Sequence, residues 1–182
     1  MEQEKGKPFL VYLIGLSGSG KSTIAQALYN SLTMQIKGKK RVELLDGDDL
    51  RQQFGGVFGY TREERMKNNQ VVRVLLCYLL KNEISVILAQ VAPYQQIRDL
   101  MRERFTENYI EVYVKCSPEE CKRRDVKGFY QKATVGEIKN LNGADDVYEI
   151  PQNSDVICDT ETKSPEECVE DILKCLSQRG YI

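Results

Sequence analysis

The chain alternates between two hydrophobic patterns along its length. Short runs of apolar and β-branched residues predict buried strands, and longer segments in which apolar residues recur at helical spacing predict amphipathic helices. The expected strands cover residues 9–14, 42–45, 84–91, 109–115 and 155–158. The expected helices cover residues 22–33, 62–81 and 95–105, with two more that start at Ser117-Pro118 and Ser164-Pro165, the last ending near Gly180. This alternation predicts an α/β fold with a five-stranded parallel sheet and helices on both faces.

One segment breaks the alternation. Residues 126–151 are polar, contain glycine and show no clear hydrophobic period. A stretch of this length inside a compact domain is more often a functional lid than a passive loop. We therefore expect a single domain over residues 1–182, with a lid at about 126–151.

The charge balance limits the kinds of partner. Twenty-six basic residues face twenty-seven acidic ones, for a net charge of −1, so no global field draws the chain to nucleic acid or to a membrane surface. No apolar stretch approaches the roughly 20 residues that span a bilayer, and the run at 9–14 is too short for the core of a signal peptide. We expect a cytoplasmic protein with a small-molecule ligand and with neither a nucleic-acid nor a membrane partner.

The cysteines and the missing histidines narrow the chemistry. None of the six cysteines forms a close CxxC pair, and the chain has no histidine. A structural zinc site and a Ser-His-Asp or Cys-His hydrolase are therefore not expected. In a reducing cytosol the thiols should be free and mostly buried. Any general base has to be a carboxylate.

The stretch Gly15–Ser22 matches a phosphate-binding loop (P-loop) in full. It reads G-x-x-x-x-G-K-[ST] between a predicted strand and a predicted helix, as this motif requires. The backbone N–H groups and the Lys21 ammonium would hold the phosphates of ATP, and the Ser22 hydroxyl would bind Mg²⁺. The residues expected at this nucleotide are Gly15, Ser17, Gly18, Ser19, Gly20, Lys21, Ser22 and Thr23. The sequence therefore predicts a P-loop NTPase fold.

A P-loop alone does not separate a kinase from a GTPase switch or a nucleotide-dependent binding module. No N-K-x-D guanine-reading motif follows a later strand. The polar segment around Lys127 and Lys132 is typical of a mobile cover that keeps water from the γ-phosphate. Both features favour a kinase.

A run of acidic residues, Asp46-Gly47-Asp48-Asp49, follows the second predicted strand. The carboxyl ends of parallel strands line the ligand crevice, so Asp46 and Asp48 are expected at the active site. A carboxylate there can orient a hydroxyl, accept its proton or hold magnesium, and Asp46 joins Ser22 as a candidate metal ligand. The alternative, an aspartate that caps the next helix, suits Asp49 better than Asp46.

Several segments resemble adenylylsulfate (APS) kinases, in order and at matching spacing over nearly the whole chain. They are Gly15–Thr23, Asp46–Arg51, Gly59–Asn68, Ala92-Pro93-Tyr94 with Arg98, Arg124–Tyr130, and Gly136–Lys139 through Tyr148–Pro151. The resemblance implies that ATP phosphorylates the 3′-hydroxyl of adenosine 5′-phosphosulfate, giving the activated sulfate donor PAPS for sulfate assimilation. Family members are often dimers, so a homodimer is a further expectation.

The resemblance also implies roles for individual residues. Asp46 would be the base, Lys127 a lid lysine near the phosphates and Arg124 a residue against the adenine of ATP. Together with Lys21, the first two would form the catalytic set. The positions that would line the acceptor site are Asp46, Gly47, Asp48, Asp49, Tyr60, Arg65, Asn68, Val91, Lys127, Leu141 and Asn142.

Four departures from the family pattern leave the acceptor open. Tyr60 replaces a phenylalanine, and Leu141-Asn142 replaces Phe-Thr, so one wall around the acceptor's adenine has no π-face. The family's Asn-Ile-Arg-Arg run reads Asn68–Val71, which removes two positive charges expected next to the acceptor. Ala92 stands where some members carry a serine proposed to be phosphorylated, which leaves direct in-line transfer.

Three functions therefore remain in view. The first is APS kinase. The second is a related kinase with another nucleotide acceptor, such as the cytidine diphosphoramidate used in capsule modification. The third is a nucleotide-binding module without chemistry, because a fold does not fix a function.

Overall fold

The computed structural model describes residues 7–36 and 41–182. Five parallel strands form one sheet in the order β2-β3-β1-β4-β5. The strands are β1 (Leu10–Ile14), β2 (Arg41–Asp46), β3 (Ile84–Gln90), β4 (Tyr109–Lys115) and β5 (Val156–Asp159). The predicted α/β fold with a five-stranded parallel sheet is confirmed, and each strand ends within one residue of its expected position.

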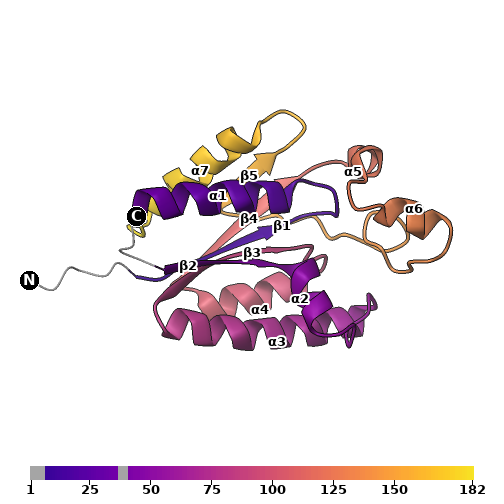
Figure 1. The fold of residues 1–182 in the computed structure, drawn as a ribbon, viewed down its shortest axis with the longest axis horizontal. Helices are drawn as coiled ribbons and strands as arrows, with labels where there is room; N and C mark the ends of the chain where they lie inside the picture. Colours follow the sequence, from indigo (N-terminus) through magenta and orange to yellow (C-terminus); the bar gives the residue numbers. More distant parts are fainter. Residues whose placement is uncertain (1–6, 37–40) are drawn as a thin grey trace, which may run out of the picture.

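Helices cover both faces of this sheet (Figure 1). α1 (Lys21–Ile36) and α7 (Pro165–Gln178) pack on one face, and α3 (Arg62–Lys81) and α4 (Gln95–Phe105) pack on the other. The central strand β1 alternates between the two cores, since Val11 and Leu13 face the first pair of helices while Leu10 and Tyr12 face the second. Burial on both faces explains why the strands read as continuous apolar runs.

Both helix starts with a serine cap are present as predicted. Ser117 precedes α5 (Pro118–Arg124), and its side chain accepts a hydrogen bond from Glu120 N. Ser164 precedes α7 and forms a capping box with Glu167. In each helix the serine oxygen satisfies a backbone N–H that has no partner within the helix.

Two short helices were not predicted. α2 (Gly47–Gln53) directly follows β2, and α6 (Phe129–Thr134) lies inside the segment expected to be irregular. Neither is long enough to show a helical period in the sequence. The capping interpretation was also wrong: Asp46, not Asp49, is the N-cap of α2, because its side chain accepts a hydrogen bond from Asp48 N.

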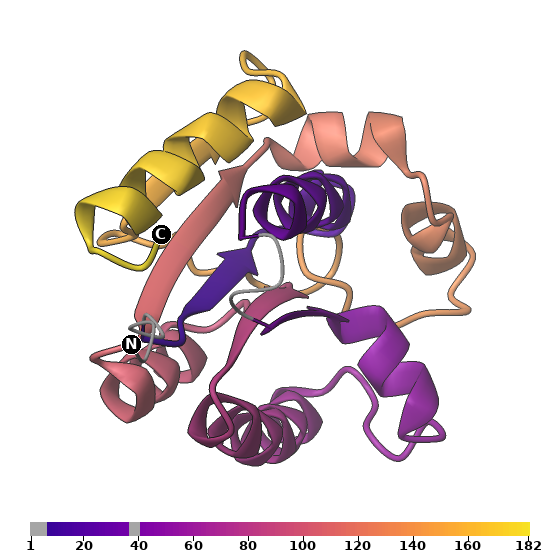
Figure 2. The same ribbon diagram turned by 60° about the vertical axis from the view of Figure 1, so that its left-hand side comes forward.

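The carboxyl ends of the central strands meet at one edge of the sheet. Asp46 at the end of β2 pairs with Ala89, and Ile14 at the end of β1 pairs with Gln90. Figures 1 and 2 show α2, α5 and α6 gathered beyond this edge. A Cβ on Gly47 would approach Gln90 Cγ to 2.5 Å, so the turn from β2 into α2 requires glycine for its close contact with β3.

Two further structural points bear on the sequence predictions. Four of the cysteines are buried and two are half-buried, which confirms the expectation of mostly buried thiols. Within the described residues, no helix combines the length and apolar character that a membrane crossing needs.

Candidate active site

A cavity of about 440 Å³ lies at the carboxyl edge of the sheet. We call the end beside the P-loop the donor end and the end beside the first turns of α3 the acceptor end. The wall between them comes from the β2–α2 turn, the last residues of β3 and the lid segment, residues 126–151. One cavity therefore reaches both sites that the sequence predicted.

The P-loop connects β1 to α1 at the donor end. Gly15 needs its glycine, because its φ is +151° and a Cβ there would collide with the backbone oxygen of Val114. Lys21 is buried, and its Nζ donates to the Leu16 carbonyl oxygen at 2.6 Å. Burial lowers the pKa of Lys21 to about 8, against the opposing effect of the Asp48 carboxylate. The ammonium thus lies inside the loop, where a phosphate would sit.

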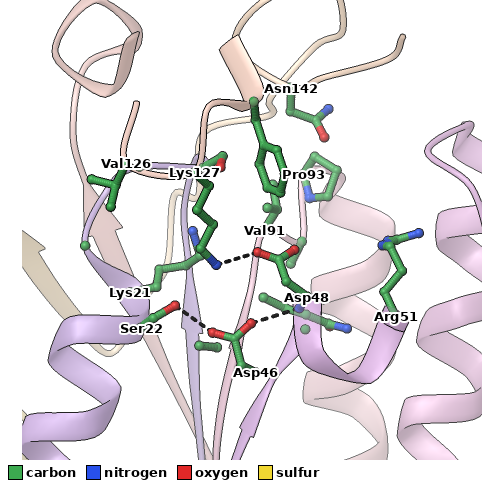
Figure 3. Close-up of a pocket in the computed structure, with 18 of the residues that line it drawn as sticks. Lys21, Ser22, Asp46, Asp48, Arg51, Val91, Pro93, Val126, Lys127 and Asn142 are labelled. Atoms are coloured by element: carbon green, nitrogen blue, oxygen red, sulfur yellow. Dashed lines mark hydrogen bonds and ion pairs between the residues drawn. The ribbon is translucent and has the colours of Figure 1, made fainter. Parts of the chain in front are cut away.

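The carboxylate of Asp46 is held between the P-loop and α2 (Figure 3). The Ser22 hydroxyl donates to Asp46 Oδ2 at 2.6 Å, and the Asp48 N–H donates to Asp46 Oδ1 at 2.8 Å. Each oxygen keeps a second lone pair for another ligand. The side chain is therefore fixed in orientation and still able to accept a hydrogen bond or a cation.

The pair formed by Ser22 and Asp46 fits magnesium. A hydroxyl and a carboxylate 2.6 Å apart are the hard oxygen ligands that Mg²⁺ takes in small number, with phosphates and water completing the shell. Among the described residues, no group of three or more acidic or cysteine side chains is close enough to hold a metal ion by itself. A magnesium ion at this pair would be shared with the phosphates of the nucleotide.

The lid segment brings a second lysine to the same place. Lys127 Nζ donates to Asp48 Oδ2 at 2.6 Å, and Figure 3 shows the side chain reaching across the cavity to do so. Partial burial opposes the charge on Lys127, but the hydrogen bond and the charge of Asp48 outweigh it, so its pKa is raised. Lys127 therefore carries a positive charge at neutral pH.

Arg124 is held rigidly at the donor end. Its Nε donates to Glu120 Oε1 at 2.8 Å, and its Nη2 donates to the Thr160 carbonyl oxygen at 2.9 Å. Thr160 in turn donates through Oγ1 to the Ser19 carbonyl oxygen of the P-loop at 2.9 Å. These contacts leave the guanidinium plane fixed beside the P-loop, where an adenine could stack on it.

The acceptor end is built around Arg65, near the start of α3. Arg65 is 7% exposed, and its guanidinium donates to the Tyr60 carbonyl oxygen at 2.8 Å and to the Asn140 carbonyl oxygen at 2.9 Å. Its centre lies 5.3 Å from the Tyr60 ring, and the Arg51 guanidinium lies 4.7 Å from the same ring. Burial, followed by the charge of Arg51, lowers the pKa of Arg65. The guanidinium groups of Arg51 and Arg65 thus both lie close to the Tyr60 ring at the acceptor end.

The lid segment closes the acceptor end from above. Leu141 is 5% exposed, lines the cavity and packs in a small cluster with Leu16, Cys116, Cys121 and Tyr130. The Tyr130 hydroxyl donates to the Ser17 carbonyl oxygen at 3.1 Å. Through these contacts the lid segment, including α6, is packed directly on the P-loop.

Most of the residues predicted from the sequence line this cavity. They are Ser17, Gly18, Gly20, Lys21, Ser22, Thr23, Asp46, Gly47, Asp48, Tyr60, Arg65, Asn68, Val91, Arg124, Lys127, Leu141 and Asn142.

Three predicted residues do not line the cavity: Gly15, Ser19 and Asp49. The first two shape the P-loop from behind, since Gly15 abuts Val114 and Ser19 is fully buried. The prediction that Asp49 lines the acceptor site is corrected, because Asp49 is exposed on α2 whereas Asp46 and Asp48 line the cavity. The interpretation that residues 70 and 71 lie next to the acceptor is also corrected, because Gln70 and Val71 are exposed and do not line the cavity.

Several lining residues were not predicted as site residues, and Arg51 and Asn69 are the two that bear on the acceptor end. Arg51 lies in the same run as Asp46, and its position one turn into a helix would have indicated it had α2 been recognised. Asn69 was seen only as a departure from the family pattern, and the structure places it in the cavity wall beside Asn68.

A comparison with protein families identifies the chain. The model of the adenylylsulphate kinase family matches residues 7–159. This chain belongs to the adenylylsulfate kinase family. Among its relatives, the adenylyl-sulfate kinase of a Picosynechococcus species is 40% identical over 94% of this chain and 95% of that protein. A probable adenylyl-sulfate kinase of Archaeoglobus fulgidus is 42% identical over 84% of this chain and 96% of that protein.

Solved structures agree with this membership. The Mycobacterium tuberculosis APS kinase in complex with AMPPNP and APS superposes with a TM-score of 0.86 at 29% identity, covering 94% of this chain and 99% of that one. A gluconokinase of Sinorhizobium meliloti superposes with a TM-score of 0.62 at 18% identity over 94% and 93% of the two chains, which shows the shared P-loop kinase fold alone.

Proposed function

We propose that this protein transfers the γ-phosphoryl group of ATP to the 3′-hydroxyl of adenosine 5′-phosphosulfate, giving ADP and PAPS. The observation that carries the proposal is the continuous cavity that runs from the P-loop to Arg65, with the Asp46 carboxylate between its two ends. Relatives named adenylyl-sulfate kinase at about 40% identity support the same reaction. A structural neighbour bound to AMPPNP and APS supports the division into a donor and an acceptor end.

In the proposed reaction Asp46 orients the 3′-hydroxyl and accepts its proton as the oxygen attacks the γ-phosphorus in line. Its two hydrogen bonds, to Ser22 and to the Asp48 N–H, fix the carboxylate before substrate binds. ADP leaves with the electrons of the broken P–O bond. The chain contains no histidine, so a carboxylate in this position is the base that the site offers.

The cations of the cavity supply electrostatic stabilisation. Lys21 lies within the P-loop, and Lys127 spans from the lid segment to Asp48, so both flank the path of the transferred group. Magnesium, held by Ser22 and Asp46 together with the phosphates, would neutralise further charge on the nucleotide. At the acceptor end the paired guanidinium groups of Arg51 and Arg65 suit the anionic phosphosulfate.

A second acceptor is favoured by one observation. Leu141, where the family carries an aromatic ring, lies in the cavity wall and is packed against Leu16 and Tyr130. The acceptor's base would thus stack on Tyr60 alone, which suits a smaller pyrimidine nucleotide such as cytidine diphosphoramidate. A nucleotide-binding role without chemistry is the third candidate.

Coupled ADP release with ATP, Mg²⁺ and APS tests the proposal. Turnover well above background hydrolysis is expected with APS, and a parallel series of cytidine nucleotides addresses the second candidate. Turnover with a cytidine nucleotide but not with APS would show that the acceptor is a cytidine nucleotide. ATP binding without turnover on any acceptor would contradict kinase activity altogether. A cytoplasmic location and assembly into a homodimer stay predictions, and gel filtration with light scattering measures the second.

A further inference from the structure

Unpaired polar atoms are concentrated at two neighbouring residues of α3. Asn68 and Asn69 are each 3% exposed, and both residues line the acceptor end of the cavity. In the described part of the chain, Asn68 Oδ1 and both polar atoms of Asn69 have no hydrogen-bond partner. Native proteins satisfy nearly all buried polar atoms, so three such atoms at one place indicate a partner that binds there.

The sequence of α3 does not need a carboxamide at this position for folding. Residues 65, 69, 72 and 76 lie at helical spacing on its buried face, and Val72 and Leu76 continue that face as ordinary core residues. An apolar side chain would fill the position without leaving a donor and an acceptor unsatisfied. Asn69 therefore costs stability in the free protein, as groups kept for binding often do.

The chemistry of the side chain indicates what it can bind. A carboxamide offers one acceptor oxygen beside a donor nitrogen. An ionised phosphate or sulfate group has only acceptors, so it would leave Asn69 Oδ1 unpaired. A base edge with an exocyclic amine next to a ring nitrogen satisfies both atoms at once, as asparagine does with adenine N6 and N7.

We propose that Asn69 recognises the amino-bearing edge of the acceptor's nucleobase, with its oxygen accepting from the amine and its nitrogen donating to the adjacent ring nitrogen. Arg65 lies 5.3 Å from the Tyr60 ring, and Asn69 follows Arg65 by one turn of α3 and lines the same cavity, so a base stacked on the Tyr60 ring would lie near the Asn69 side chain. Asn69 is thus a specificity-determining residue for adenine or cytosine. The proposal rests on the proposed function only in taking the acceptor to be a nucleotide.

Isothermal titration with the donor end filled by MgADP tests this. The probes are AMP and purine riboside 5′-monophosphate, which lacks the amine, and CMP with its counterpart that also lacks the amine. The wild-type protein should bind the amino-bearing member of at least one pair about tenfold more tightly than its counterpart, and Asn69→Leu should abolish that difference. Gln70→Leu is the matched control, because Gln70 is the next residue on α3 but lies exposed outside the cavity. It should keep the preference.

Thermal unfolding without nucleotide separates this role from a structural one. Asn69→Leu, and Asn69→Ile as a second variant, should unfold at the same or a higher temperature than the wild-type protein. A preference that persists in both variants, an absent preference in the wild-type protein, or a clear fall in unfolding temperature would overturn the proposal. An absent preference in the wild-type protein, or a fall in unfolding temperature in the variants, would instead indicate that buried water satisfies the Asn69 carboxamide and that the residue has a structural role. A preference for CMP over AMP would support Asn69 recognition while contradicting APS as the acceptor.

Discussion

The two ends of the cavity are built by different means. The donor end is built on one continuous stretch, Gly15–Ser22, whose backbone conformation and lysine are set by local turns and by contacts with α1 and β4, and to which Asp46 and Arg124 add single side chains. The acceptor end is assembled from α3 and the lid segment, which are far apart in sequence and joined by the hydrogen bond from Arg65 to the Asn140 carbonyl oxygen.

The difference also appears in the hydrogen bonds. At the donor end Lys21, Ser22 and Asp46, which line the cavity, already have partners at 2.6 to 2.8 Å before any ligand is bound, while the Ser19 hydroxyl, which does not line the cavity, is buried without one. At the acceptor end Asn68 and Asn69 are buried with unpaired atoms. A site that binds one constant ligand can be built from backbone and completed in advance, whereas a site that selects among nucleotides leaves polar atoms for the ligand to satisfy. Reaction type and acceptor choice are therefore separable in this protein.

The largest expected effect comes from Asp46→Asn. Asparagine keeps an oxygen to cap α2 and a group that can pair with Ser22, but it is not a base. We expect kcat to fall about 10³-fold with little change in the dissociation constant for ATP. Steady-state kinetics and titration of ATP measure the two quantities. A loss below tenfold would contradict the role of Asp46, and a lost fold, seen by circular dichroism, would identify a capping role instead.

Lys127→Met should have the next largest effect. Methionine keeps the length of the side chain but removes the charge that flanks the transferred group. We expect kcat to fall about 10²-fold while ATP affinity stays within about threefold. The ion pair with Asp48 is about 40% exposed on both sides, so its loss should not change the unfolding temperature measurably. An equal loss of ATP affinity and kcat would mean that Lys127 binds ATP in the ground state and does not act specifically on the transition state.

The sequence predicted the donor end well and the acceptor end only through the family resemblance. A P-loop carries its geometry in eight consecutive residues, and strands buried on both faces have an unmistakable apolar pattern. α2 and α6 have seven and six residues, so neither completes enough turns to show a period. The inward direction of Asn69 and the outward direction of Gln70 depend on the phase of α3 against the sheet, which tertiary packing decides.

The pH dependence of ATP binding isolates the donor end. Burial lowers the pKa of Lys21 to about 8, so the ammonium is fully charged below about pH 7 and binding there needs no extra proton. Above pH 8 most of the free protein has lost this proton, so Lys21 must take up a proton when the triphosphate binds. The dissociation constant for ATP should therefore rise toward about tenfold per pH unit above pH 8. Titrations from pH 6.5 to 9.5 measure this, with Lys21→Met as the control that should bind weakly and independently of pH.

Leu141→Phe should have the smallest effect and bears most directly on the acceptor. Leu141 is the cavity wall where the family carries an aromatic ring, and it is buried against Leu16 and Tyr130. A phenylalanine would add a π-face opposite Tyr60 and should lower the KM for APS by about threefold, less than a free stacking interaction gives, because the larger ring must also fit the packed cluster. Leu141→Met is the matched control, since it keeps the volume without the ring. Equal KM values for the two variants would mean that the acceptor's base does not lie between Tyr60 and residue 141, and the loss of an aromatic wall would then say nothing about which nucleotide the site accepts.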